Sequence, residues 1–251
     1  MSTAGEAVFP PLADRERIIV ALDVASADEA RALVDELKGS VGAFKVGLQL
    51  FTTAGPEFVR ELTAQGHRIF LDLKFHDIPN TVARAAAEAV KLGVWMYNVH
   101  ASGGSEMMRR TVEAADAAAR SGGVQRPLLL GVTVLTSSDA ETLNQTGVAD
   151  QVDDLVTRLA SLSEESGLDG VVASPREAEN IRKCVTKPGF LIVTPGIRAS
   201  LGTMDDQKRV TTLRQAVRSG ADYVVIGRPI TEAANRLAAV DEIIGDVENG
   251  A

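Results

Sequence analysis

The sequence predicts an α/β fold, a single-domain (β/α)8 (TIM) barrel over residues 17–251. Short β-branched runs alternate with Ala- and charge-rich stretches of helical spacing, and there are eight of each. Regular alternation of this kind requires a parallel sheet with helices packed on it. Each unit takes roughly 30 residues, so eight of them approach the ~250 residues of a typical closed barrel.

Residues 1–16 are expected to form a flexible N-terminal arm, because Pro10 and Pro11 interrupt regular structure there. The barrel strands are then expected at 17–23, 43–48, 68–74, 96–101, 127–135, 170–174, 190–197 and 223–228. The helices are expected at 27–38, 56–65, 79–92, 105–120, 151–166, 175–185, 211–219 and 231–243. The chain shows no linker or repeat that would indicate a second domain.

Capping and breaking residues support these helix boundaries. Ser26 followed by Glu29 forms a capping box at the start of the first helix. Pro56, Pro79 and Pro175 stand where a first helical turn tolerates proline. Glycines follow several helices, where a left-handed residue is favoured, at positions 66, 93, 167 and 220.

An open, doubly wound sheet is the alternative architecture. Such sheets usually carry a glycine-rich dinucleotide turn after the first strand. Here that turn, residues 23–28, contains no glycine, and neither GxGxxG nor GxxxxGK[ST] occurs elsewhere. The closed barrel is therefore favoured.

Composition excludes several classes of function. With 26 basic and 34 acidic residues the net charge is −8, which argues against binding to nucleic acid or to an anionic membrane. No apolar run reaches about 18 residues, so no membrane span is expected. The single cysteine, Cys184, excludes an internal disulfide and favours a reducing compartment. Residues 1–17 lack the features of a secretory signal, so a cytoplasmic location is expected.

A metal site is not expected. Three histidines and one cysteine are poor material for a zinc site, and no HExxH, CxxC or EF-hand pattern is present. His76 and His100 are interpreted as structural, hydrogen-bonded residues, and Trp95 as a packing residue.

Polar residues gather where the predicted strands end, which is where barrel enzymes place their active sites. Strand 17–23 ends in Asp23, strand 43–48 carries Lys45, and strand 68–74 carries Asp72 and Lys74. Charged residues inside apolar runs are costly to bury unless they are paired. Polar or charged residues occur at this end of five strands, which favours a functional site over ion pairs that only stabilise the fold.

The densest cluster lies in residues 69–81. The two-residue period of a strand puts Asp72 and Lys74 on one face, and Asp77 follows in the loop. With Lys45 these residues form an alternating array of ammonium and carboxylate groups, which keeps Lys74 protonated. Such an array suits a reaction that develops a carbanion, because fixed charges stabilise the anion and an ammonium group protonates it.

A phosphate site is expected from the last two strands. Gly227 and Arg228 end the eighth strand, and residues 195–198 (PGIR) follow the seventh. Loops after these strands often hold a phosphate through backbone amides and a guanidinium group. The polar connection 199–210 is long for such a loop and is interpreted as a lid.

At these residues the sequence closely resembles the bacterial orotidine 5′-phosphate decarboxylase family. The most specific matching block is FLDLKFHDIPNTV at 70–82. Other blocks, in the family's order, are ALD (21–23), FKVG (44–47), GVWMYNVHASGG (93–104), GVTVLTS (131–137), GLDGVV (167–172), VTPGIR (193–198) and VIGRPI (225–230). The resemblance implies cofactor-independent decarboxylation of orotidine 5′-phosphate to uridine 5′-phosphate, the last step of de novo pyrimidine synthesis, by a homodimer with shared sites.

The resemblance also implies residue roles. Lys74 looks like the proton donor to carbon 6, and Asp72 like the carboxylate beside the departing one. Asp77, Ile78 and Thr81 look like contributions to the partner subunit's site. The remaining substrate contacts implied are Asp23 and Lys45 for the ribose, Thr136 for the ring, Gln207, Gly227 and Arg228 for the phosphate, and Arg198 in a less specific role.

Two other functions remain open. A metal-dependent sugar-phosphate decarboxylase or synthase of the same superfamily shares the strand-three motif but places a metal-binding carboxylate on the second strand. This chain has Lys45 there, which would repel a divalent cation. A non-catalytic barrel would bind ligand without turnover.

Overall fold

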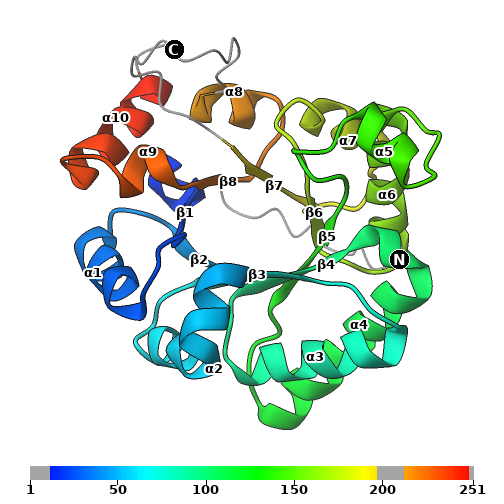
Figure 1. Ribbon diagram of the computed structural model, residues 1–251, viewed down its shortest axis with the longest axis horizontal. Helices are drawn as coiled ribbons and strands as arrows, with labels where there is room; N and C mark the ends of the chain where they lie inside the picture. Colours follow the sequence, from blue (N-terminus) through cyan, green and yellow to red (C-terminus); the bar gives the residue numbers. More distant parts are fainter. Residues whose placement is uncertain (1–11, 197–211, 249–251) are drawn as a thin grey trace, which may run out of the picture.

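The computed structural model describes residues 12–196 and 212–248. Eight parallel strands form a closed barrel in the order β1 to β8, and helices surround it (Figure 1). The predicted (β/α)8 barrel is thereby confirmed. The strands are β1 (Ile18–Ala21), β2 (Ala43–Gly47), β3 (Ile69–Phe75), β4 (Met96–His100), β5 (Leu128–Val132), β6 (Gly170–Val172), β7 (Leu191–Pro195) and β8 (Tyr223–Ile226).

The barrel closes because β1 pairs with both β2 and β8. Ile19 lies opposite Ala43 on one side and Val225 on the other. The surrounding α-helices are α1 (Ala27–Leu37), α2 (Leu48–Ala64), α3 (Pro79–Lys91), α4 (Gly104–Gly122), α5 (Ala140–Gln145), α6 (Val152–Glu165), α7 (Ala178–Cys184), α8 (Leu213–Arg218), α9 (Arg228–Thr231) and α10 (Arg236–Glu248). Among the described residues no helix is long and apolar enough to cross a membrane.

Strand alternation divides the core into two layers. Ile19 and Ala21 of β1 point into the barrel, where they pack with Phe70 and Met96. Ile18 and Val20 of β1 face outward and join the larger core between the strands and the helices. This arrangement follows from the two-residue period of a strand, and it leaves the strand ends free to carry polar groups.

The helix after β2 begins earlier than the sequence predicted. α2 runs from Leu48 to Ala64, but Gly55 interrupts it with a φ of 71°. The predicted helix at 56–65 is its second part, which begins at Pro56. The first part, 48–54, was missed because it follows β2 without any connecting loop.

Several other elements differ from the prediction. The short helices α5 and α9 were not predicted, and β5 and β8 end at Val132 and Ile226, before residues 135 and 228. The last helix begins at Arg236 rather than at 231, because Asn235 caps it by accepting a hydrogen bond from the N–H of Ala238. Short helices carry too little periodicity to be recognised in sequence.

The end of the expected N-terminal arm has regular structure. Asp14–Arg17 form a 3-10 helix, η1, and Leu12 packs against the inner core of the barrel. Residues 1–11 of the arm lie outside the described residues.

Candidate active site

Three charged side chains converge at the carboxyl ends of β2 and β3. The Nζ of Lys74 lies 2.6 Å from Oδ1 of Asp72, and the Nζ of Lys45 lies 3.4 Å from Oδ2 of the same carboxylate. Lys45 also contacts Oδ1 of Asp23, beyond the end of β1, at 3.0 Å. The result is a chain of alternating charges, Asp23–Lys45–Asp72–Lys74, referred to below as the charge array.

The array is partly withdrawn from solvent. The side chains of Lys45 and Asp72 are 10% and 13% exposed, whereas that of Asp23 is 61% exposed. Burial alone would raise the pKa of Asp72, but the charges of Lys45 and Lys74 and hydrogen bonds from Lys74 and Asn98 outweigh it, so this pKa lies below its ordinary value. Asp72 is therefore a carboxylate at neutral pH.

Strand β3 is distorted where it carries the array. Its pairing with β4 shifts register between Leu71 and Phe75. Lys74 is the only non-glycine residue in 12–196 and 212–248 with a positive φ, 51°. This backbone conformation disfavours residues with a Cβ, and it is commonest at functional sites.

A cavity of about 190 Å³ opens beside the array. Lys45, Asp72 and Lys74 form its charged side. Its other lining residues are Phe70, Val132, Val134, Leu135, Thr136, Ser137, Val172, Ala173, Pro195 and Val225. A planar polar ligand could therefore lie with one edge against the charges and a face against apolar side chains.

Two glycines leave room at the edge of the array. A Cβ at Gly47, the last residue of β2, would lie 2.9 Å from Nζ of Lys45 and so would displace this ammonium group. A Cβ at Gly227 would lie 4.0 Å from Oδ2 of Asp23, which places the end of β8 beside the array. Arg228 follows Gly227 at the start of α9 and is exposed.

Asp77 is not brought into the array within one chain. It lies in the loop between β3 and α3, it is exposed, and its carboxylate accepts a hydrogen bond from the N–H of Ile78 at 2.6 Å. Asp23 instead supplies the second carboxylate of the array, which corrects the grouping expected from sequence. Ile78 is 67% exposed, and Thr81 in the first turn of α3 is exposed as well. Arg198 and Gln207 lie outside the described residues.

His76 and His100 pack against each other beside the array. Their ring centroids are 5.3 Å apart. Burial, together with the neighbouring charges of His76 and Lys74, lowers the pKa of His100. His100 is therefore neutral at physiological pH.

Asn98 is the site residue that sequence reasoning missed. It lies in β4, is 1% exposed, and hydrogen-bonds to both Asp72 and Lys74. Its position as a polar residue inside the apolar run 96–101 is the sequence feature that could have identified it.

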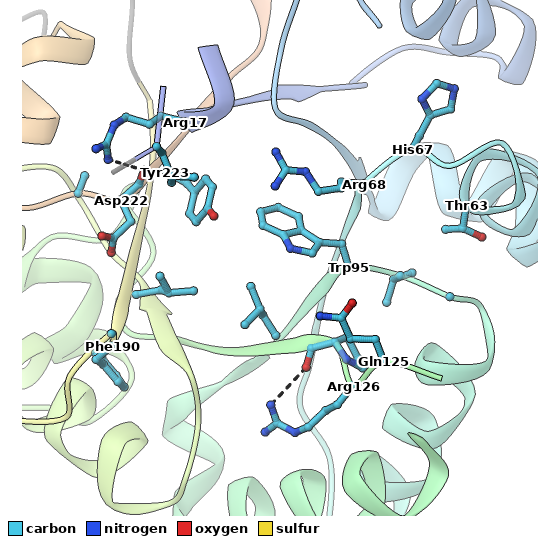
Figure 2. A pocket seen from close by; sticks show the side chains of 18 of the residues that line it. Arg17, Thr63, His67, Arg68, Trp95, Gln125, Arg126, Phe190, Asp222 and Tyr223 are labelled. Carbon is cyan, nitrogen blue, oxygen red and sulfur yellow. Dashed lines mark hydrogen bonds between the residues drawn. The ribbon is translucent and has the colours of Figure 1, made fainter. Parts of the chain in front are cut away.

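The largest cavity described lies at the opposite end of the barrel and has a volume of about 1140 Å³ (Figure 2). Arg68 stands over the ring of Trp95, with its guanidinium carbon 5.0 Å from the ring centroid, and Trp95 packs edge-on against Tyr223. Trp95 thus serves the packing role expected for it.

Arginines around this cavity hold the starts of the strands together. Arg182 of α7 donates to the carbonyl of Gly220 and pairs with Asp222, which itself accepts from the N–H of Ile192 in β7. Arg126 forms ion pairs with Asp116 and Asp169. These contacts stabilise the fold, as is usual for the amino-terminal face of such barrels.

The fold is that of (β/α)8 enzymes, which place their active sites at the carboxyl ends of the strands, where the charge array of this chain lies. The family model described as "Orotidine 5'-phosphate decarboxylase / HUMPS family" matches residues 16–243. The chain belongs to this family.

Individual relatives cover nearly the whole chain. It is 50% identical over 236 residues to the orotidine 5′-phosphate decarboxylase of Geobacter sulfurreducens, covering 94% of this chain and 98% of that protein. It is 52% identical to that of Syntrophomonas wolfei, covering 93% and 98%. The crystal structure of orotidine 5′-phosphate decarboxylase from Lactobacillus acidophilus superimposes with a TM-score of 0.80 at 37% identity, covering 92% of this chain and 98% of that one.

Proposed function

We propose that this enzyme decarboxylates orotidine 5′-phosphate to uridine 5′-phosphate and CO2 in pyrimidine biosynthesis, without a metal or organic cofactor. The observation that carries the proposal is the charge array at the mouth of the barrel, in a chain half identical to decarboxylases of this name. The nucleotide would enter at the carboxyl ends of the strands.

The charge array can stabilise the negative charge that this reaction develops on carbon 6. Loss of CO2 from carbon 6 leaves an electron pair in the plane of the pyrimidine ring, where the π system cannot delocalise it. Fixed positive charge close to that carbon is therefore required. Lys74 supplies it, because its ammonium group is held at 2.6 Å from Asp72 and lines the cavity. Lys74 then protonates carbon 6.

Asp72 has two roles in this mechanism. Its carboxylate holds Lys74 and Lys45 in place. By resemblance to the family, it would also lie beside the departing carboxylate of the substrate. Because its pKa is depressed, it stays ionised, and its negative charge lies 2.6 Å from the Nζ of Lys74.

The remaining substrate contacts follow the family pattern. Asp23 and Lys45 would bind the ribose hydroxyls, and Thr136, which lines the cavity, would contact the ring. The Gly227 amide and Arg228 would bind the phosphate, together with Gln207, and Arg198 would make a further contact. Phosphate binding far from carbon 6 contributes energy that can be used in the transition state.

We propose further that the enzyme is a cytoplasmic homodimer whose sites are completed across the interface. The exposed position of Asp77, Ile78 and Thr81, beside the array but outside it, supports a role in a neighbouring subunit's site.

The test is to follow the loss of orotidine 5′-phosphate absorbance with purified enzyme, before and after treatment with a strong chelator. We expect turnover that survives chelation. The metal-dependent sugar-phosphate decarboxylase or synthase would lose activity with the chelator, and a non-catalytic barrel would bind nucleotide without any change in absorbance. Lys45, which places an ammonium group at the array, disfavours the metal-dependent reading.

A further inference from the structure

Asn98 contacts the array from the neighbouring strand without lining the cavity. Its Nδ2 donates to Oδ1 of Asp72 at 2.7 Å, and its own Oδ1 accepts from the backbone N–H of Lys74 at 2.8 Å. Asn98 is 1% exposed, so these two hydrogen bonds replace those that its amide would make with water. Buried amides of this kind are retained where both hydrogen bonds are made.

The first hydrogen bond sets the orientation of the Asp72 carboxylate. Oδ1 of Asp72 receives both the amide of Asn98 and the ammonium group of Lys74, while Oδ2 faces Lys45 at 3.4 Å. Without the amide, the carboxylate could rotate about its terminal torsion, which is broad for aspartate. The distance from Lys74 to the reacting carbon would then change.

The second hydrogen bond supports the backbone of Lys74. A φ of 51° is unfavourable for lysine, and β3 has left its regular pairing with β4 at this point. The side-chain oxygen of Asn98 takes the place of the missing ladder partner for the N–H of Lys74. This contact keeps the residue in the conformation that turns its side chain into the cavity.

We propose that Asn98 is a positioning residue for the decarboxylation. Its amide clamps the Asp72 carboxylate and the Lys74 backbone, and it acts on the reaction through them. The inference rests on the proposed function for its kinetic readout, but the clamp itself can be tested without turnover.

The first experiment compares Asn98→Ala with the control Thr111→Val. Thr111 is also fully buried and hydrogen-bonds to the carbonyl of Met107 within α4, remote from the array. We expect Asn98→Ala to lower kcat by about 100-fold with KM changed less than about threefold. Thr111→Val should leave both constants within about twofold of wild type. Equal effects of the two substitutions on kcat would overturn the proposal.

The second experiment uses Asn98→Asp, which keeps the acceptor for the Lys74 N–H but removes the donor to Asp72. Asp72 and Lys74 of β3 contact this position directly. Lys45 of β2 pairs with Asp72, and His100 of β4, with His76 beside it, interacts with Lys74 and Asp72. Two adjacent carboxyls share a proton more readily as pH falls, and the protonated one can donate. We expect kcat relative to wild type to rise between about pH 8 and about pH 6. A constant ratio would count against the clamp.

A crystal structure of Asn98→Ala separates failure of the inference from failure of the proposed function. We expect φ of Lys74 to leave the positive region and its Nζ to move away from Asp72. If wild type lacks turnover but this change occurs, the proposed function fails and the clamp stands. If the backbone and ion pair are unchanged in the variant, the clamp is refuted.

Discussion

Lys74 combines a functional charge with an unfavourable backbone. Its side chain is 28% exposed, and its ammonium group pairs with Asp72 and lines the cavity at the barrel mouth. Residues held in rare conformations persist when surrounding contacts determine them. The contacts here come from β4 as well as β3, so the position of one side chain depends on two strands.

Replacing this lysine tests its chemical role. We expect Lys74→Ala to lower kcat for orotidine 5′-phosphate by about 10³-fold or more, because both the proton donor and the charge facing carbon 6 are lost. Lys91→Ala is the matched control, since Lys91 pairs with Glu88 on the exposed face of α3. Activity of Lys74→Ala within about tenfold of wild type would contradict the assignment.

Asp72 links the array to acid stability. Its pKa in the folded state lies below the ordinary value of 3.8, so the folded state binds this proton less tightly than the unfolded chain does. The stabilisation is therefore fully present above about pH 3.8 and is lost as pH falls through the lower, folded-state pKa.

The measurement is urea unfolding of wild type and Asp72→Asn across this pH range. The variant leaves Lys45 and Lys74 without their shared carboxylate, so wild type should be more stable at neutral pH. We expect this difference in unfolding free energy to stay constant from about pH 6 to about pH 4 and to shrink as pH falls further. A difference independent of pH would show that ionised Asp72 does not stabilise the fold.

At the scale of elements, β6 restricts which residue can stand at its first position. It has three residues, and its first, Gly170, faces β7 so closely that a Cβ would lie 2.3 Å from the carbonyl oxygen of Leu191. The backbone of Leu191 cannot move aside as a flexible side chain could. The strand therefore depends on glycine for close approach rather than for an unusual φ.

Gly170→Ala should accordingly destabilise the protein by about 2–4 kcal/mol, measured by urea unfolding. Gly122→Ala provides the comparison, because a Cβ there would make only ordinary contact, 3.6 Å from Val124, at the end of α4. We expect this second change to be neutral or slightly stabilising. Similar losses in both variants would refute the steric argument.

Elements also show why much of the fold was predictable. Strand–helix alternation repeats along the whole chain, so the barrel could be expected even where single boundaries were wrong. α9 has four residues and is separated from β8 by Gly227 alone, so no periodic pattern marks it. Lys45, Asp72 and Lys74 stood out because charge interrupts apolar strands. Asn98 did not, because its importance depends on partners 24 and 26 positions away.

At the scale of the whole molecule, the two ends of the barrel have different tasks. Ion pairs at the amino-terminal end join strands and helices, whereas those at the carboxyl end surround a small cavity. Asp77 and Ile78 are exposed at this carboxyl end, and their position supports the proposal that two subunits share each site.

Subunit mixing tests this assembly. Asp77→Ala and Lys74→Ala homodimers should each be nearly inactive, while the exchanged heterodimer regains one site that holds both residues. We expect activity to return on mixing, up to about a quarter of wild type for random exchange of subunits. Absence of recovery after exchange is verified by native mass spectrometry would exclude a shared site.

The formal charges of Asp23, Lys45, Asp72 and Lys74 cancel. This array consequently offers little net attraction to small ions such as bicarbonate or chloride, even though it contains two ammonium groups. An anionic group binds favourably there only when it is part of a larger ligand whose other contacts lie outside the array.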